Sequence, residues 1–264
     1  MAATTFLACH SPKTSSTTQH VTDTLDAGGQ MGTLALYVEG AKEMSITTCV
    51  FDAYGTLFDV ASAARRASSQ PENHAISECW RQIAADWRAK QLNYTWLRTI
   101  AKEHADFWQI TQDALDWALE AQEISDANLR QRLLDLYRHL DAYSEVTTVL
   151  RDLSARGVSC SILSNGTHDM LNAAIGSAGL SHAFTNVWSI DDIGVFKPDT
   201  RVYDMVTAPK DGVLFMSSNG WDAAGAAHYG WRTVWVNRAG DPVDRLYGMP
   251  QIIERDLTKI AEYL

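Results

Sequence analysis

A short apolar stretch that ends abruptly on a carboxylate constrains the fold of this chain more than any other feature. Residues 46–51 are apolar or β-branched, Asp52 follows directly, and Gly55 with Thr56 then breaks the run. Such a stretch predicts a buried parallel strand. Because open α/β sheets bind ligands at the carboxyl ends of their strands, Asp52 is predicted to lie at a ligand site. An aspartate that merely caps a turn is the alternative interpretation.

The later part of the chain repeats the pattern of strand and helix. Apolar runs predict strands at residues 158–163, 185–190, 212–216 and 233–236, and helical spacing predicts helices at residues 146–156, 167–178, 201–207 and 222–229. Gly157 and Gly179 follow two of these helices, as C-terminal caps do. The alternation predicts an α/β fold with a doubly wound, Rossmann-like parallel sheet.

A long segment without a strand signal interrupts this alternation. Helical spacing appears in residues 76–104, 112–120 and 128–140, and five of the nine tryptophans lie there. We therefore expect residues 44–62 and 144–264 to form the core. Residues 63–143 are expected to form an inserted all-helical cap over the edge of the sheet.

The first 43 residues differ in composition from the rest. Residues 11–24 are rich in Ser and Thr, which predicts a tail without a fixed structure. An early start codon is a second explanation, because Met44 directly precedes the first predicted strand. A short strand at residues 34–38 is a further expectation. A secretory signal is not expected, since a basic start followed by a long apolar core is missing.

The net charge and the cysteines limit the binding partners and the cellular setting that we expect. The formal net charge of −10 argues against binding to nucleic acid or to an anionic membrane. The four cysteines are scattered, without a pair at zinc spacing, so we expect a reducing, cytoplasmic setting. No apolar run approaches transmembrane length.

Polar residues gather directly after the predicted strands or in the loops beside them. They are Asp52 and Thr56, then Ser164 and Asn165, then Lys197, and finally Ser217, Asn219 and Asp222. The carboxyl ends of parallel strands share one edge of a sheet, so these side chains are expected to converge on one pocket.

These motifs resemble the haloacid dehalogenase superfamily and, within it, the L-2-haloacid dehalogenases. The resemblance covers about residues 46–240, and the segment around Arg88 narrows it to the second group. It rests on Asp52-Ala53-Tyr54-Gly55-Thr56-Leu57-Phe58-Asp59-Val60, Trp87-Arg88, Lys90-Gln91-Leu92, Tyr94-Thr95-Trp96-Leu97-Arg98, Leu163-Ser164-Asn165-Gly166, Lys197-Pro198-Asp199, Arg201-Val202-Tyr203, Ser217-Ser218-Asn219 and Trp221-Asp222.

The resemblance implies a hydrolytic dehalogenase of short (S)-2-haloalkanoic acids that yields (R)-2-hydroxyalkanoic acids. Asp52 would displace halide and form an ester, and Asp222 would activate the water that hydrolyses it. The resemblance also implies roles for the other residues. Thr56 and Ser217 would orient Asp52, Asn219 and Lys197 would fix the geometry of hydrolysis, and Ser164 and Lys197 would bind the substrate carboxylate. Arg88 would bind halide with Asn165, Phe107 and Trp221, while Tyr54 and Leu92 would line the pocket and Tyr203 would be a further active-site tyrosine.

Taken without the resemblance, several of these residues have plainer explanations. Arg88 is then read as a solvated arginine on a helix face, and Tyr54 as a core aromatic. Asp222 also opens a predicted helix, where it would serve as an N-cap. Tyr203 would pack a helix, and Ser164 would belong to an ordinary turn.

Tyr54 separates the enzyme classes that share these motifs. Phosphatases of the superfamily usually carry an acid two residues after the nucleophile, to protonate the leaving alcohol, and halide needs no proton. They also bind Mg²⁺ through clustered carboxylates, whereas Ser217-Ser218-Asn219 follows the fourth strand here. We therefore expect no metal and no cofactor. The alternatives are a Mg²⁺-dependent small-molecule phosphatase and a non-catalytic relative with this fold. A homodimer is implied by the resemblance alone.

Overall fold

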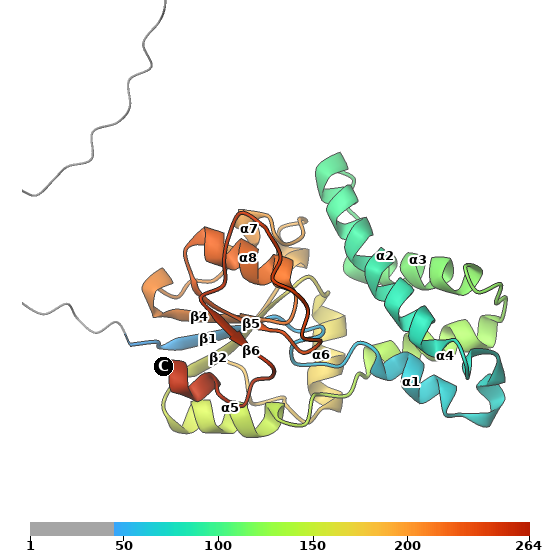
Figure 1. Cartoon of the computed structure of the whole chain (residues 1–264), viewed down its shortest axis with the longest axis horizontal. Coiled ribbons are helices and arrows are strands. Elements are labelled where there is room, and N and C mark those ends of the chain that lie inside the picture. Colours follow the sequence, from blue (N-terminus) through green and yellow to red (C-terminus); the bar gives the residue numbers. More distant parts are fainter. Residues whose placement is uncertain (1–44) are drawn as a thin grey trace, which may run out of the picture. The chain divides into compact units, whose positions relative to one another are not determined.

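The computed structural model describes residues 45–264, and six parallel strands form its single sheet. In chain order the strands are β1 (Thr48–Phe51), β2 (Ser159–Ser164), β3 (Asn186–Ser189), β4 (Val213–Ser217), β5 (Arg232–Val236) and β6 (Ile252–Glu254). Their order across the sheet is β3-β2-β1-β4-β5-β6, so β1 lies between β2 and β4 (Figure 1). This arrangement confirms the predicted α/β fold with a doubly wound parallel sheet.

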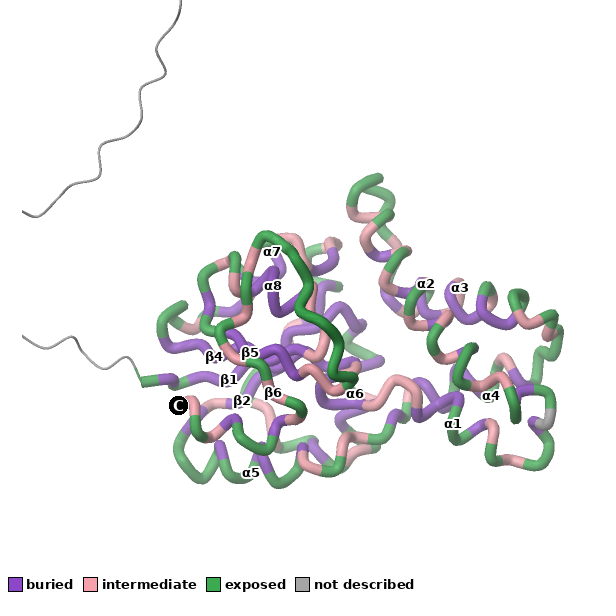
Figure 2. The backbone as a smooth tube through the Cα atoms, in the orientation of Figure 1, coloured by how far each residue is buried: buried purple, intermediate pink, exposed green. Residues whose placement is uncertain are grey.

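Helices cover the sheet on both sides. The helices in the second half of the chain are α5 (Val146–Ala155), α6 (His168–Ser177), α7 (Thr200–Tyr203) and α8 (Gly220–Tyr229). Short 3₁₀ helices lie at Ile190–Asp192, Lys210–Gly212 and Ile260–Tyr263. Figure 1 shows α8 and α5 on opposite faces. Every residue of β1 and of β4 is consequently buried, as Figure 2 shows. A strand covered on both faces needs no alternation of polar and apolar residues, which explains the continuous apolar runs.

Four helices lie between β1 and α5. They are α1 (Ser62–Ser68), α2 (Trp80–Ala101), α3 (Phe107–Glu120) and α4 (Ala127–Arg138), with a 3₁₀ helix at Pro71–Ile76. We call these four helices the helical insertion. Asp106 and Asp126 cap α3 and α4 by accepting hydrogen bonds from backbone N–H groups. The buried indole of Trp87 donates to the carbonyl of Thr111 at 2.8 Å and so joins α2 to α3.

Most predicted elements are found within a few residues of their predicted bounds. Gly157 and Gly179 have φ angles of +76° and +70°, so both end their helices as predicted. One α-helix and one strand were missed: α1, which has no apolar period, and β6, which has three residues and an exposed Ile253 at its centre. The four 3₁₀ helices were not predicted either. The predicted helix at residues 201–207 extends only over Thr200–Tyr203.

The predictions for residues 1–43, including the strand at residues 34–38, lie outside the described residues. Within residues 45–264, every helix is too short or too polar to cross a membrane.

Candidate active site

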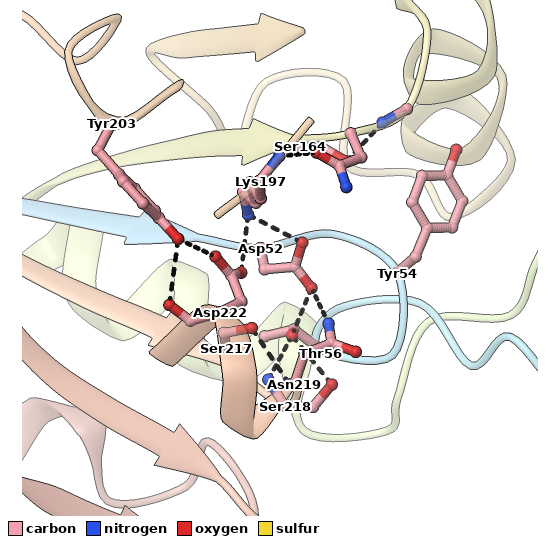
Figure 3. Close-up of polar contacts among 12 residues, drawn as sticks. Asp52, Tyr54, Thr56, Ser164, Lys197, Tyr203, Ser217, Ser218, Asn219 and Asp222 are labelled. Atoms are coloured by element: carbon pink, nitrogen blue, oxygen red, sulfur yellow. Dashed lines mark hydrogen bonds and ion pairs between the residues drawn. The ribbon is translucent and has the colours of Figure 1, made fainter. Parts of the chain in front are cut away.

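The predicted polar residues converge at the carboxyl edge of the sheet. Asp52 follows β1, Ser164 ends β2, Ser217 ends β4, and Asp222 lies in the first turn of α8. Figure 3 shows the Asp52 carboxylate between the Lys197 ammonium on one side and Thr56 and Asn219 on the other. Residues that are up to 170 positions apart in the chain thus meet because parallel strands end at a common edge.

Three side chains hold the Asp52 carboxylate, which is 6% exposed. Its Oδ2 accepts hydrogen bonds from Thr56 Oγ1 and from Asn219 Nδ2, both at 3.0 Å. Its Oδ1 accepts from Lys197 Nζ at 3.1 Å. Oδ2 thus has two donors and Oδ1 has one from the described residues, which leaves Oδ1 a lone pair for a ligand.

The turn after β1 is built for a close approach to β4. Gly55 has a φ of +92°, and a Cβ at this position would lie 2.8 Å from Ser218 Oγ. Glycine is therefore required here. The turn brings Thr56 Oγ1 to 2.8 Å from the backbone N–H of Ser218, from which it accepts. Ser218 thus fixes the hydroxyl that donates to Asp52.

Lys197 is a buried cation between two carboxylates. Its Nζ lies 3.1 Å from Asp52 Oδ1 and 2.9 Å from Asp222 Oδ2, and the residue is 1% exposed. Burial by itself would lower the pKa of Lys197, but Asp222 and Asp52 outweigh it and raise the pKa above its ordinary value. The ammonium therefore stays charged and neutralises one of the two carboxylates.

Asp222 is fully buried and is bonded on both oxygens. Oδ2 accepts from Lys197, and Oδ1 accepts from Tyr203 Oη at 2.9 Å. Burial raises the pKa of Asp222 above its ordinary value, and Lys197 opposes this rise. The N-cap of α8 is Asn219, and Asp222 is the third residue of the helix, so the N-cap explanation for Asp222 is wrong. A carboxylate with a raised pKa is a better base near neutral pH.

A glycine in α8 makes room for this arrangement. A Cβ on Gly225 would lie 2.5 Å from Tyr203 Oη and 2.8 Å from Pro198 Cβ. Because both distances are far below contact, no larger residue fits without moving Tyr203. Gly225 therefore permits the hydrogen bond between Tyr203 and Asp222.

Ser217 contacts a different carboxylate from the one expected. Its Oγ accepts from the backbone N–H of Asn219 at 3.2 Å, and its hydroxyl hydrogen-bonds Asp222. Within residues 45–264 the hydrogen bonds to Asp52 come from Thr56, Asn219 and Lys197, so the expectation that Ser217 orients Asp52 is not met.

Ser164 and Asn165 keep hydrogen-bond donors for a ligand. Ser164 Oγ accepts from the backbone N–H of Gly166 at 3.1 Å, which leaves the hydroxyl hydrogen free to donate. Asn165 Oδ1 accepts from the backbone N–H of Lys197 at 3.0 Å, and among residues 45–264 its Nδ2 has no hydrogen-bond partner. Each residue is 7% exposed or less.

Arg88 extends from α2 of the helical insertion to the core. Its guanidinium donates to Asn219 Oδ1 at 3.1 Å and to the carbonyl of Tyr54 at 3.2 Å. Asn219 therefore bonds Arg88 with its oxygen and Asp52 with its nitrogen. The interpretation of Arg88 as a solvated arginine on a helix face is wrong.

Sequence reasoning missed the residue that holds Arg88. Gln91, three residues further along α2 and 1% exposed, accepts from Arg88 Nη1 at 2.8 Å. Its Nε2 donates to Thr111 Oγ1 at 2.7 Å and to Tyr137 Oη at 3.1 Å. The spacing of three residues places Arg88 and Gln91 on one helix face, and this was the signal in the sequence.

Aromatic rings pack beside the polar residues of the candidate site. Tyr54, 2% exposed, stacks on Tyr137 with centroids 5.8 Å apart and lies 5.9 Å from Phe107. Burial raises the pKa of Tyr54 well above 10, so its phenol stays neutral. Trp221 packs edge to face on Trp96 at 5.4 Å. Leu92 is half-buried on α2, one turn beyond Arg88.

The described residues hold no group of three or more His, Cys, Asp or Glu side chains in a geometry suited to a metal ion. The two carboxylates of the site instead share Lys197. The expected independence from metal and cofactor stays a prediction.

A family profile, a curated sequence and a solved structure all show similarity to haloacid dehalogenases. The sequence profile of haloacid dehalogenase-like hydrolases matches residues 46–230. The (S)-2-haloacid dehalogenase 1 of Pseudomonas sp. (strain CBS-3) is 42% identical over 202 residues, which are 75% of this chain and 87% of that protein. A crystal structure of an L-2-haloacid dehalogenase is 36% identical, with a TM-score of 0.78 over 83% of this chain and 98% of its own.

A third relative was solved with a ligand. It is an L-2-haloacid dehalogenase from Xanthobacter autotrophicus with chloropropionic acid covalently bound. That protein is 30% identical, with a TM-score of 0.71 over 82% of this chain and 97% of its own.

Proposed function

The chain belongs to the haloacid dehalogenase-like hydrolases, and on that premise we propose that it hydrolyses short (S)-2-haloalkanoic acids to (R)-2-hydroxyalkanoic acids and halide. The observation that carries this proposal is the double use of Asn219. Its amide nitrogen holds the Asp52 carboxylate and its oxygen holds the Arg88 guanidinium. These two hydrogen bonds support the proposal that Asp52 is the nucleophile and that Arg88 is the cation for the leaving group.

In the first step Asp52 Oδ1 attacks C2 of the substrate. The new C–O bond forms as the carbon–halogen bond breaks, the bonding electrons leave with the halide, and C2 is inverted once. Arg88 stabilises the charge that develops on the halide, and its guanidinium stays protonated throughout. Asn165 Nδ2, Phe107 and Trp221 complete the halide site.

The substrate is held by its carboxylate. The free hydroxyl of Ser164 donates to it, and Lys197 supplies the opposite charge. Tyr54 and Leu92 form apolar walls beside C2. An anionic substrate is thereby bound by a local cation although the whole chain carries a net charge of −10.

In the second step water hydrolyses the ester of Asp52. Asp222 takes a proton from the water, the oxygen adds to the Cγ of Asp52, and the bond from Cγ to the substrate oxygen breaks. The product alkoxide takes the proton from Asp222. Asp52 is left with one oxygen from water, and its remaining carboxyl proton passes to solvent, which regenerates the carboxylate. Lys197 and Asn219 keep the ester in place, and Tyr203 holds Asp222.

Halide release from (S)-2-chloropropionate in the presence of EDTA tests the proposal, with the (R) enantiomer as the blank. Fast and enantioselective release is the expected result. Absence of release from both enantiomers, together with Mg²⁺-dependent hydrolysis of phosphate esters, would establish the phosphatase instead. Tyr54 in place of a second acid opposes that alternative.

Three further parts of the proposal concern organisation. Residues 63–143 act as a cap that carries Arg88 to the core, the chain forms a homodimer, and it works in the cytoplasm. Light scattering after size-exclusion chromatography measures the oligomeric state directly. A monomer at micromolar concentration would contradict the homodimer.

A further inference from the structure

A cavity of about 450 Å³ lies beside the site. This volume is within the range of pockets that take drug-sized ligands and is far more than a three-carbon acid requires. Most of its wall is apolar. The lining residues come from α2, from residues 196–199 and from the segments after β4 and β5: Trp96, Thr99, Ile100, Phe196, Lys197, Pro198, Asp199, Trp221, Leu246 and Tyr247.

The cavity is continuous with the catalytic groups. Lys197 lines it, and its Nζ lies 3.1 Å from the Asp52 carboxylate. Trp221 also lines it and belongs to the proposed halide site. Burial raises the pKa of Tyr247, and the negative charge of Asp222 raises it further, which shows that Tyr247 lies near this carboxylate. One end of the cavity therefore contains Lys197 and the carboxylate of Asp199, and most of the remaining wall is apolar.

The loop that forms the outer wall is held in place by close backbone contact. A Cβ on Gly248 would lie 2.0 Å from the carbonyl oxygen of Ala224 in α8, so glycine alone allows the loop to lie on this helix. The ring of Tyr247 packs edge to face on His228 of α8 with centroids 5.1 Å apart. Leu246 and Tyr247 are thereby fixed over the cavity, although the loop around them is exposed (Figure 2).

We propose that this cavity is a subsite for the side chain of longer 2-haloalkanoic acids, which extends the substrate class beyond the three-carbon acid. The inference rests on the proposed function. Ser164 and Lys197 hold the carboxylate, and Arg88 takes the halide. The alkyl substituent on C2 then follows the apolar wall from Trp221 toward Ile100, Leu246 and Tyr247.

The rate of halide release across a homologous series tests this proposal. The substrates are (S)-2-chloropropionate, (S)-2-chlorobutyrate, (S)-2-chlorohexanoate and (S)-2-chlorooctanoate. Each methylene that enters an apolar site lowers KM by about two- to fourfold. We expect KM to fall through the hexanoate and then to level off. A kcat/KM that drops steeply beyond propionate would overturn the subsite.

Matched variants locate the effect. The double variant Ile100→Ser with Leu246→Ser changes two residues of the cavity that are 78% and 41% exposed. The control, Leu97→Ser with Val243→Ser, changes residues of the same helix and the same loop that are 54% and 43% exposed and lie outside the cavity. In the first variant the ratio of kcat/KM for the chlorooctanoate to kcat/KM for the chloropropionate should fall by about fivefold or more. Equal loss in both variants would overturn the assignment.

Binding of acids without halogen separates the two hypotheses. Octanoate and propionate are titrated against the wild-type chain by calorimetry, and octanoate should bind at least tenfold more tightly. Turnover of chloropropionate without tighter binding of octanoate would remove the subsite and leave the proposed function. Tight octanoate binding without halide release from any substrate would remove the proposed function and keep an alkanoate site in this cavity.

Discussion

Replacing Tyr203 with Phe isolates the second chemical step. The change removes one hydroxyl, which donates to Asp222 Oδ1 at 2.9 Å. The ring keeps its packing against Phe215, Tyr229 and Trp231, whose centroids lie 5.5 to 6.2 Å away. The fold should therefore persist while Asp222 loses a hydrogen bond.

The size of the effect follows from the kind of bond that is lost. A hydrogen bond to a charged group contributes about 1.5–3 kcal/mol. If the bond holds Asp222 in position for hydrolysis, its loss slows that step by about 10- to 150-fold. The attack of Asp52 on the substrate should change little, because Thr56, Asn219 and Lys197 still hold this carboxylate.

The assay is rapid-quench measurement of halide with mass spectrometry of the protein. We expect a burst of about one halide per site, followed by slow turnover, and a protein mass raised by the carboxyalkyl ester on Asp52. Tyr229→Phe is the matched control, because its phenol donates to Asp204 at 2.6 Å outside the site. A uniformly slow reaction without a burst would show that Tyr203 does not act through Asp222.

Three further predictions follow from the same contacts. Asp52→Asn should abolish halide release, since an amide is a poor nucleophile; activity near the wild-type level would exclude Asp52 as the nucleophile. Lys197→Met leaves two buried carboxylates without their cation and should lower the free energy of unfolding by about 3–5 kcal/mol in urea titrations, while an unchanged midpoint would contradict the bridging role. Ester hydrolysis should be lost as the pH falls through the raised pKa of Asp222, so the acidic limb of single-turnover hydrolysis lies above pH 3.8; a limb at or below that pH would refute it.

The sequence predicted the fold and the central residues because both depend on strong local patterns. Residues 46–51, which contain β1, are an uninterrupted apolar run that a strand buried on both faces requires, and Asp52 ends it. Gly157 and Gly179 marked the ends of two helices through their need for a positive φ. Residues that follow such strands converge by topology alone.

Most of the remainder depends on contacts between elements that are distant in the sequence. The spacing places Gln91 on the helix face of Arg88, but its burial becomes evident only when α3 and α4 bring Thr111 and Tyr137 to it. Ser217 was assigned to the wrong carboxylate because spacing gives the strand end but not the direction of a hydroxyl. Gly225 reads as one small residue in an alanine-rich helix until Tyr203 is seen against it.

The hydrogen bond from Arg88 to Asn219 joins two parts of the chain to which the proposed mechanism gives different roles. In the proposed mechanism the core contains the nucleophile and the base, and the helical insertion contributes the cation that receives the leaving group. Exchanging insertions between relatives would therefore alter which halogen is expelled while ester hydrolysis continues unchanged. In such a chimera the new insertion would need a residue that hydrogen-bonds Asn219 as Arg88 does.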